Sequence, residues 1–193
     1  MSRKNPQGSS ITDLISCIPE VMLDGGQPRM WYFPELGAES FKAGEIVCLS
    51  GGAGNAIGLT KCVTSGLVSA SGYGVVGVAA EDASGVASSF KAVYVATPEC
   101  IFVANIGHSS TSANAQTAAS DLGQLYGLHS ISGRTFVDKA KTSVSCTIAR
   151  VLGFHGQDVV PTFYGRVYFN ILDYACQLRI NTWNTSSTVD IAT

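Results

Sequence analysis

The sequence predicts a mostly β protein: a small barrel or sandwich with one short helix, set between an extended N-terminal arm and a C-terminal tail. From Phe41 onward, short apolar runs alternate with glycine-containing turns at spacings of about ten residues. Val, Ile, Thr, Tyr and Phe dominate these runs, as they do in β-strands. Four of the six prolines lie in the first 40 residues. Evenly spaced short strands are typical of a sandwich or barrel, and not of alternating strands and helices.

Residues 1–40 are expected to form the extended arm. Proline fixes φ, removes a hydrogen-bond donor and pushes the preceding residue toward extended geometry. A disordered linker would lack the apolar residues of this segment, so we expect the arm to lie along its own domain or along a neighbour. The residues that would make this contact are Leu14, Ile15, Ile18, Val21, Met22, Leu23, Trp31, Tyr32 and Phe33. Aromatic residues dominate interface hot spots, so the last three are candidates for an anchor; the alternative is that they form a first strand of the barrel.

Residues 41–172 are expected to form the β body. The predicted strands are 45–50, 59–65, 74–80, 91–97, 100–106, 126–132, 135–139, 144–154 and 165–172. The Ala- and Gln-rich segment 111–127 differs from them and predicts one short helix, which Thr111 or Ser112 would cap and Gly123 or Gly127 would end. The tail, residues 173–193, is mostly polar, and we expect a partner to order it.

The composition favours association with other protein. Hydrophobic residues make up 46% of the chain and charged residues only 13%, roughly half the usual charged share. The alternative is a polar surface built from Ser, Thr, Asn and Gly.

A net charge of −2 without a long basic run argues against nucleic-acid binding. The apolar runs are far shorter than a membrane span needs, and the N-terminal residues lack a signal-peptide core. The six scattered cysteines predict reduced, buried thiols.

A glycine-rich segment, "LSGGAGNAIGLT" at residues 49–60, invites comparison with a phosphate-binding loop. A dinucleotide loop starting at Gly52 and Gly54 would need its third glycine at position 57, which is isoleucine. The following residues alternate and are β-branched, so no helix begins there to face an anion. No Gly-Lys-Ser/Thr follows either. The segment is therefore predicted to be a hairpin turn between two strands.

No catalytic, cofactor or metal site is predicted. His108 precedes Ser109, but adjacency in sequence does not make a triad, and no Gly-x-Ser-x-Gly turn is present. His129 and His155 are expected to be ordinary strand and loop residues. Acidic residues are too sparse to mark a pair of facing carboxylates of the kind a glycosidase requires. A small hydrolase around His108 and Ser109 stays as a lesser alternative.

Five segments of the body, in order, resemble the head decoration (cement) proteins of tailed bacteriophages. They are "FKAGEIVCLSGG" (41–52), "GVVGVAAEDASG" (74–85), "VYVATPECIFVANI" (93–106), "DLGQLYGLHSISGRTFVD" (121–138) and "ARVLGF" (149–154) followed by "DVVPTFYGRVYFNIL" (158–172). The order and spacing of the segments carry the resemblance, which covers about residues 41–172. The arm and the tail lie outside it.

This resemblance implies a β-tulip-like barrel that acts as a structural virion protein. Such proteins bind the outside of the capsid, contact the major capsid protein, often form homotrimers and commonly use an N-terminal arm for the capsid contact. The implied location is the capsid surface of the virion, and the host cytoplasm during assembly. The resemblance transfers no catalytic residue. Another virion module, at the tail or fibre base, is the nearest alternative.

Overall fold

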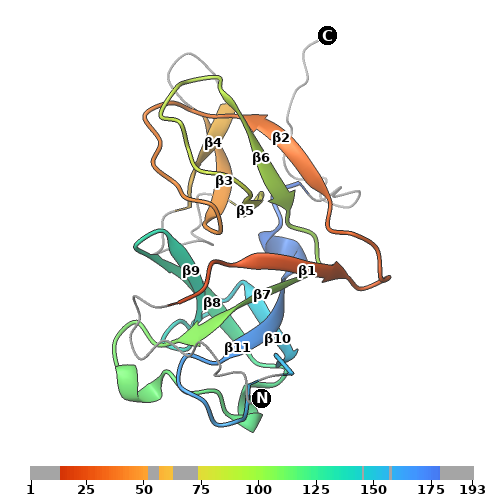
Figure 1. The fold of residues 1–193 in the computed structure, drawn as a ribbon, viewed down its shortest axis with the longest axis vertical. Coiled ribbons are helices and arrows are strands. Elements are labelled where there is room, and N and C mark those ends of the chain that lie inside the picture. Colours follow the sequence, from red (N-terminus) through yellow and green to blue (C-terminus); the bar gives the residue numbers. More distant parts are fainter. Residues whose placement is uncertain (1–13, 52–56, 63–73, 145, 157, 179–193) are drawn as a thin grey trace, which may run out of the picture.

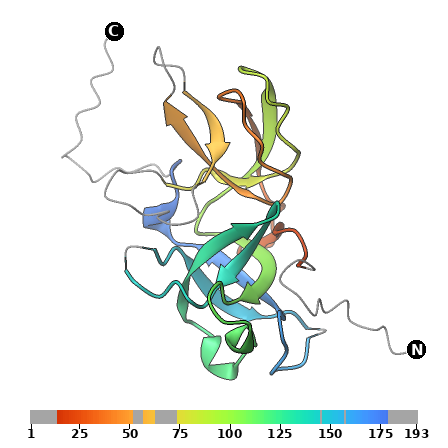
Figure 2. The same ribbon diagram turned by 90° about the vertical axis from the view of Figure 1, so that its left-hand side faces the viewer.

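The computed structural model describes residues 14–51, 57–62, 74–144, 146–156 and 158–178. In this part of the chain, eleven strands form two sheets, and the only helical elements are short 3-10 turns. The two sheets lie one above the other along the long axis of the molecule (Figures 1 and 2). The mostly β fold that the sequence predicts is confirmed.

Five strands of the lower sheet close into a barrel. Their order is β7 (Cys100–Gly107), β11 (Arg166–Ile171), β10 (Ala149–Phe154), β8 (Leu125–Ile131) and β9 (Arg134–Asp138). These neighbours are antiparallel, and the barrel closes because β9 also pairs in parallel with the end of β7, through Ile106↔Val137 and Gly107↔Asp138. Strand β1 (Ile18–Met22) pairs in antiparallel fashion with the first half of β7.

The upper sheet has five antiparallel strands. Their order is β2 (Met30–Pro34), β6 (Phe90–Val95), β5 (Gly77–Ala79), β3 (Ile46–Gly51) and β4 (Ile57–Lys61). The sheet curls so that its two edge strands meet at one end. There Glu35, directly after β2, forms a parallel bridge with Leu59 of β4. Most of β2 therefore remains an edge strand.

The chain passes between the two sheets three times. It does so between β1 and β2, between β6 and β7, and again after β11, where η5 (Asp173–Ala175) leads back to the upper sheet. The last passage is fastened by Gln177, whose side-chain amide accepts from Leu49 N–H at 2.8 Å and donates to the Leu49 carbonyl at 2.9 Å. Val75 pairs with Cys176 in the same place.

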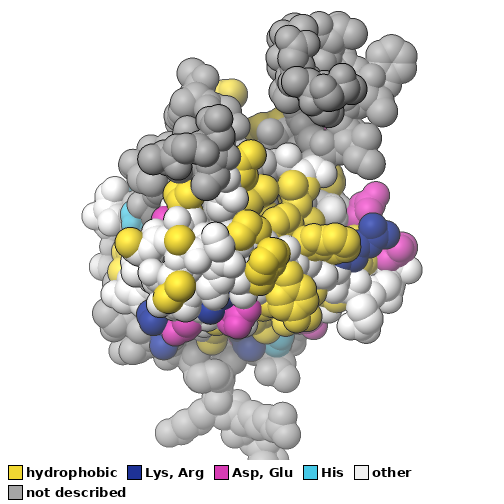
Figure 3. All heavy atoms as spheres, turned by 90° about the horizontal axis from the view of Figure 1, so that it is seen from above, with side chains coloured by type: hydrophobic (Ala, Val, Ile, Leu, Met, Phe, Trp, Pro, Cys, Tyr) yellow, Lys and Arg dark blue, Asp and Glu magenta, His cyan; other side chains and the backbone are white. Residues whose placement is uncertain are grey.

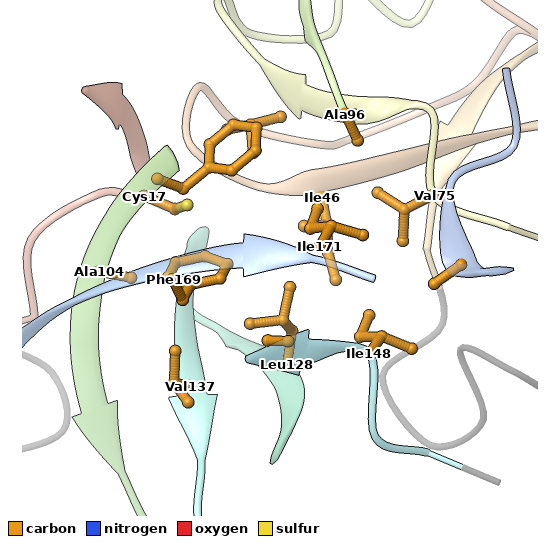
Figure 4. Close-up of a cluster of buried hydrophobic side chains, with 14 of the residues drawn as sticks. Cys17, Ile46, Val75, Ala96, Ala104, Leu128, Val137, Ile148, Phe169 and Ile171 are labelled. Carbon is orange, nitrogen blue, oxygen red and sulfur yellow. The ribbon is translucent and has the colours of Figure 1, made fainter. Parts of the chain in front are cut away.

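One apolar core joins the two sheets. Ile46 of β3 and Val75, just before β5, face Leu128, Ile148 and Ile171 on the barrel side (Figure 4). All five side chains are at most 1% exposed. A smaller cluster lies within the curled upper sheet, and a third lies at the lower end of the barrel. Because the largest cluster draws on both sheets, the two cannot separate without exposing it to water.

The glycine-rich segment 49–60 is a β hairpin, as predicted, since β3 and β4 pair from Val47↔Lys61 to Gly51↔Ile57. Its tip, 52–56, lies outside the described residues.

All six cysteines are free; five are buried as predicted, and Cys146 is half-buried.

In place of the one short helix expected in 111–127, the structure has two 3-10 turns, η3 (Ser112–Asn114) and η4 (Ala119–Asp121). The second turn is held by Asp121, whose carboxylate accepts from the N–H of Ala118 at 2.7 Å. Short polar side chains that bond nearby backbone in this way favour turns over longer helices. Strand β8 then begins at Leu125, inside the predicted helix.

The arm expected at 1–40 is extended in its described part, and it supplies β1 to the barrel sheet and β2 to the upper sheet. It therefore lies along its own body. Of the expected tail, only 173–178 are described, and these residues form η5 and the contact with Leu49. Trp183 and the rest of the tail lie outside the described residues.

Gly77→Ala tests the packing of the upper sheet. A Cβ at Gly77 would overlap the carbonyl oxygen of Tyr94 and lie 2.7 Å from Cγ1 of Val93. We expect a loss of about 3 kcal/mol in the free energy of unfolding, because the backbone of β6 must move. Urea unfolding would measure it. The matched control is Gly153→Ala in β10, where the nearest atom is 3.7 Å away; it should leave stability equal or slightly higher. Equal urea midpoints for the two variants would contradict the packing described here.

Candidate interaction surface

The nine arm residues predicted to contact a partner fall into three groups. Leu14 and Met22 are buried. Ile15, Val21 and Phe33 are half-buried. The exposed group is Ile18, Leu23, Trp31 and Tyr32. Of the nine, only the last group is exposed.

Leu14 and Met22 are corrected from contact residues to core residues. Leu14 packs in the lower barrel cluster with Phe136 and Tyr164, and its carbonyl accepts a hydrogen bond from the Arg134 guanidinium. Met22 belongs to the large shared core. An extended segment buries apolar side chains against whatever sheet it joins, and β1 joins β7 of its own chain.

An exposed apolar face lies on β2 and β6. Residues opposite each other in paired strands share a face, and the register sets Tyr32 against Ala92 and Pro34 against Phe90. Met30, Tyr32 and Phe90, which we call the outer face, are 47%, 56% and 66% exposed. Figure 3, a view from above, shows hydrophobic side chains gathered over this end of the molecule.

The opposite face of β2 is only partly covered. Phe33 packs against the cluster inside the upper sheet, whereas Trp31 on the same face is 66% exposed. An edge strand with aromatic side chains exposed on both faces is uncommon in a monomer, because such edges pair with other chains. Together with the outer face, Trp31 makes β2 the candidate interaction strand.

The sequence analysis missed Phe90 and Met30 as members of this surface. The signal for Phe90 was present in "FKAVYV" (90–95), where period-two alternation places Phe90, Ala92 and Tyr94 on one face. That β6 lies beside β2 is a pairing between distant parts of the chain, which no local pattern reveals.

Two buried carboxylates of the upper sheet, Glu35 and Glu45, are satisfied within the chain. Glu35, 2% exposed, accepts from the N–H and hydroxyl of Ser84 at 2.9 and 2.8 Å and from the N–H of Gly85 at 2.6 Å. Desolvation raises its pKa, but these hydrogen bonds outweigh it and hold the pKa of Glu35 below its ordinary value. Glu45 pairs with the Lys61 ammonium at 2.6 Å. The carboxylates of Glu35 and Glu45 therefore bind loops to strands within the upper sheet.

The barrel carries a shallow pocket of about 470 Å³, whose lining includes His108, Tyr126 and Lys139. The Lys139 ammonium lies 2.9 Å from a carboxylate oxygen of Asp121 and 2.9 Å from the carbonyl of Gln116. The Tyr126 hydroxyl donates to Asp121 at 2.8 Å, and burial with this carboxylate raises the pKa of Tyr126. The polar groups in this network thus bond mainly to each other. No group of three potential metal ligands occurs among the described residues.

His108 and Ser109 do not face each other as a base and a nucleophile. His108 Nδ1 accepts from the N–H groups of Ser110 and Thr111 at 3.3 and 3.0 Å, so the lone pair of this nitrogen is already hydrogen-bonded. Ser109 instead donates its N–H to Asp138, at 3.0 Å. This arrangement gives no structural support to the hydrolase alternative.

Asp138 fixes the loop that follows β7. It is fully buried, accepts from the N–H groups of Ser109 and Ala140 at 3.0 and 2.9 Å, and lies 3.4 Å from His129 Nδ1. Desolvation raises its pKa, but the His129 ring and these hydrogen bonds prevail and lower the pKa of Asp138 to about 2. The Asp138 carboxylate therefore holds the loop after β7 in place, and we call this set of contacts the clasp.

In comparisons with known proteins, no family model, no curated protein and no solved structure matches this chain. Among the described residues, no helix has the length and hydropathy to cross a membrane.

Asp138→Asn should make the protein less stable at pH 7 and flatten its acid unfolding. The carboxylate has its lowered pKa only in the folded state, so its contribution is present above about pH 4 and is lost as the pH falls toward 2. The expected loss at pH 7 is about 2 kcal/mol, measured by urea unfolding from pH 7 down to pH 2. Asp24→Asn, in an exposed turn, is the control. If the free energy of unfolding of Asp138→Asn depends on pH as steeply as that of the parent protein, the role of Asp138 described here is contradicted.

Proposed function

We propose that this protein is a structural virion protein that binds the outside of a phage capsid and stabilises it by bridging major capsid protein subunits. The observation that carries the proposal is the exposed apolar outer face of Met30, Tyr32 and Phe90, held on a rigid β body. The ordered resemblance of residues 41–172 to capsid decoration proteins supports it, as does the low content of charge.

The proposed mechanism is adhesion across a seam. A shell under pressure from packed nucleic acid fails where its subunits separate, and a protein bound across the boundary must first detach. Its binding free energy therefore adds to the stability of the shell by mass action. The shared core suits this role, because the two sheets cannot separate without exposing its apolar side chains to water. The protein would act without a cofactor and without catalysis.

Several weak contacts would combine if the protein is a homo-oligomer, with a trimer favoured by the resemblance. Once one subunit is bound, the others bind at a raised effective concentration. The proposed location is the capsid surface of the virion, following synthesis in the host cytoplasm. Electron microscopy of labelled virions would separate this proposal from a tail or fibre-base module, since decoration places many copies over the head.

The double variant Tyr32→Asp/Phe90→Asp tests the outer face. Two carboxylates in the contact would remove apolar burial and add uncompensated charge, and we expect capsid affinity to fall by about 30-fold or more. Co-sedimentation with capsids assembled from the accompanying major capsid protein would measure it. Substitutions are preferable to deleting the arm, because β1 and Leu14 belong to the folded body.

The control is Leu122→Asp, a residue with 56% exposure next to η4 in the barrel half. It should bind capsids like the parent. Melting temperatures of all variants would show that the fold is retained. Parent-like capsid binding by a well-folded Tyr32→Asp/Phe90→Asp protein would refute the role of the outer face.

A further inference from the structure

We propose that the open edge of β2 pairs with β2 of a second copy of this chain, antiparallel, about a two-fold axis at Trp31. This contact would use the backbone of β2, whereas the capsid contact would use side chains of the outer face. The inference does not depend on the proposed capsid function.

The backbone of β2 presents unpaired groups away from β6. The N–H of Val95 donates to the carbonyl of Arg29 at 2.9 Å, and the N–H of Glu35 donates to the carbonyl of Ser89 at 2.8 Å. The register between these two pairs has no bulge. Odd-numbered residues of β2 therefore face β6, and the N–H and C=O groups of Met30 and Tyr32 point outward.

Among the described residues, which leave out the hairpin tip 52–56, no strand pairs with this edge at Met30 or Tyr32. The other edge strand, β4, lies against the end of β2, through the bridge Glu35↔Leu59 and the hydrogen bond from Leu36 N–H to the Leu59 carbonyl at 3.0 Å. The sheet is thus closed near Pro34 and Glu35 and open at Met30 and Tyr32. Two outward residues, Met30 and Tyr32, offer two donors and two acceptors to an added strand.

Two prolines flank this edge at equal distances from Trp31. Pro28 and Pro34 each lie three residues from it, in "PRMWYFP" (28–34). Proline has no N–H and limits strand pairing, so an added strand can pair fully only between the two prolines. An antiparallel copy centred on Trp31 fits this window, because its own prolines then fall opposite these two and outside the pairing.

That register satisfies every outward group of Met30 and Tyr32. Met30 lies opposite Tyr32 of the second copy and exchanges two hydrogen bonds with it, and the two-fold axis repeats the pair to give four. A register centred on Met30 or on Tyr32 would place one of these residues opposite a proline and leave a carbonyl unpaired. Trp31 would meet Trp31 of the second copy as a non-hydrogen-bonded pair, in which side chains lie closest.

The side chains of β2 favour pairing with a second copy of this chain over pairing with a charged partner. No side chain within Met30–Pro34 is charged, and Arg29 would lie opposite Phe33 of the second copy, where a guanidinium is attracted to an aromatic face. Paired residues share a face, so the outer faces of the two copies would lie side by side on one continuous sheet. Such a doubled face is compatible with capsid binding.

This contact is small. Five residues per strand bury less than a standard specific interface, so we expect a weak dimer in solution. Copies held close together on a shell would reach effective concentrations in the millimolar range, where weak pairing becomes populated. The two-fold contact is distinct from the three-fold contact that a trimer would use.

Disulfide trapping tests the pairing and its register. With oxidised glutathione as the oxidant, Trp31→Cys should form a covalent dimer, because position 31 lies opposite itself. An equimolar mixture of Met30→Cys and Tyr32→Cys should cross-link and retains Trp31. Either of these two alone should not, since its own copies lie more than about 7 Å apart between Cα atoms, beyond disulfide range.

Val86→Cys is the control for random collision, since Val86 is 61% exposed and lies outside β2. The parent protein gives the background from native thiols. Non-reducing electrophoresis reads out the dimer. No dimer above background from both Trp31→Cys and the mixture would overturn the pairing. Equal dimer from Met30→Cys alone and from the mixture would overturn the register.

Sedimentation velocity of the unmodified protein gives an independent measurement. Its mass should rise with concentration toward two chains at about 1 mM, the range reached on a crowded shell. Met30→Pro, which removes an outward N–H but no hydrogen bond to β6, should stay at one chain with little change in melting temperature. A parent that remains at one chain at about 1 mM, or whose self-association survives Met30→Pro, would overturn the proposal.

Discussion

The apolar core shared by the two sheets is the constraint on which the rest of the structure depends. Side chains from both sheets fill one volume, with Phe102 and Phe169 in contact at 5.8 Å between ring centroids. Three chain passages and the Gln177 side chain tie the sheets across it. In the upper sheet, β6 pairs with β5 on one side and with β2 on the other, so β2 ends the sheet. The exposed side chains of Trp31 and Tyr32 therefore lie on an edge strand.

Buried acidic side chains of this protein hold loops in place. Among the described residues, Glu35, Glu45, Asp121 and Asp138 are buried, and each accepts at least one backbone N–H. Burying a carboxylate is unfavourable unless it is paired or hydrogen-bonded, so these positions fix the loops against the strands. A buried carboxylate adds no charge to the surface of the protein. In a chain with few charged residues, apolar side chains therefore make up more of the surface around β2. The low charge content and the exposed outer face are related in this way.

Much of the β body could be predicted because its signals are local. Alternation and β-branched residues mark β3, β6, β7 and β11, and the failure of the third glycine at Ile57 correctly predicted a hairpin. The arm could be predicted only as extended. Its prolines and irregular spacing hide β1 and β2, whose pairing with β7 and β6 depends on residues some 60 to 80 positions away. For the same reason Leu14 and Met22 were taken for contact residues: the sequence shows that a residue is apolar, but the sheet it joins decides whether it is buried.

An open strand edge with exposed aromatic residues is a liability for any protein, because it can pair with whatever extended chain it meets. Pro28 and Pro34 limit that risk by confining full pairing to the few residues between them. Proteins that need no edge contact usually cover the edge or place a charge on it, and this strand does neither among its described neighbours. Exposed Trp31 and Tyr32 in this short segment between the prolines are explained if the segment pairs with one specific strand. Two prolines placed symmetrically about Trp31 fit a second copy of the same strand, and a two-fold contact closes on itself without growing into a fibre.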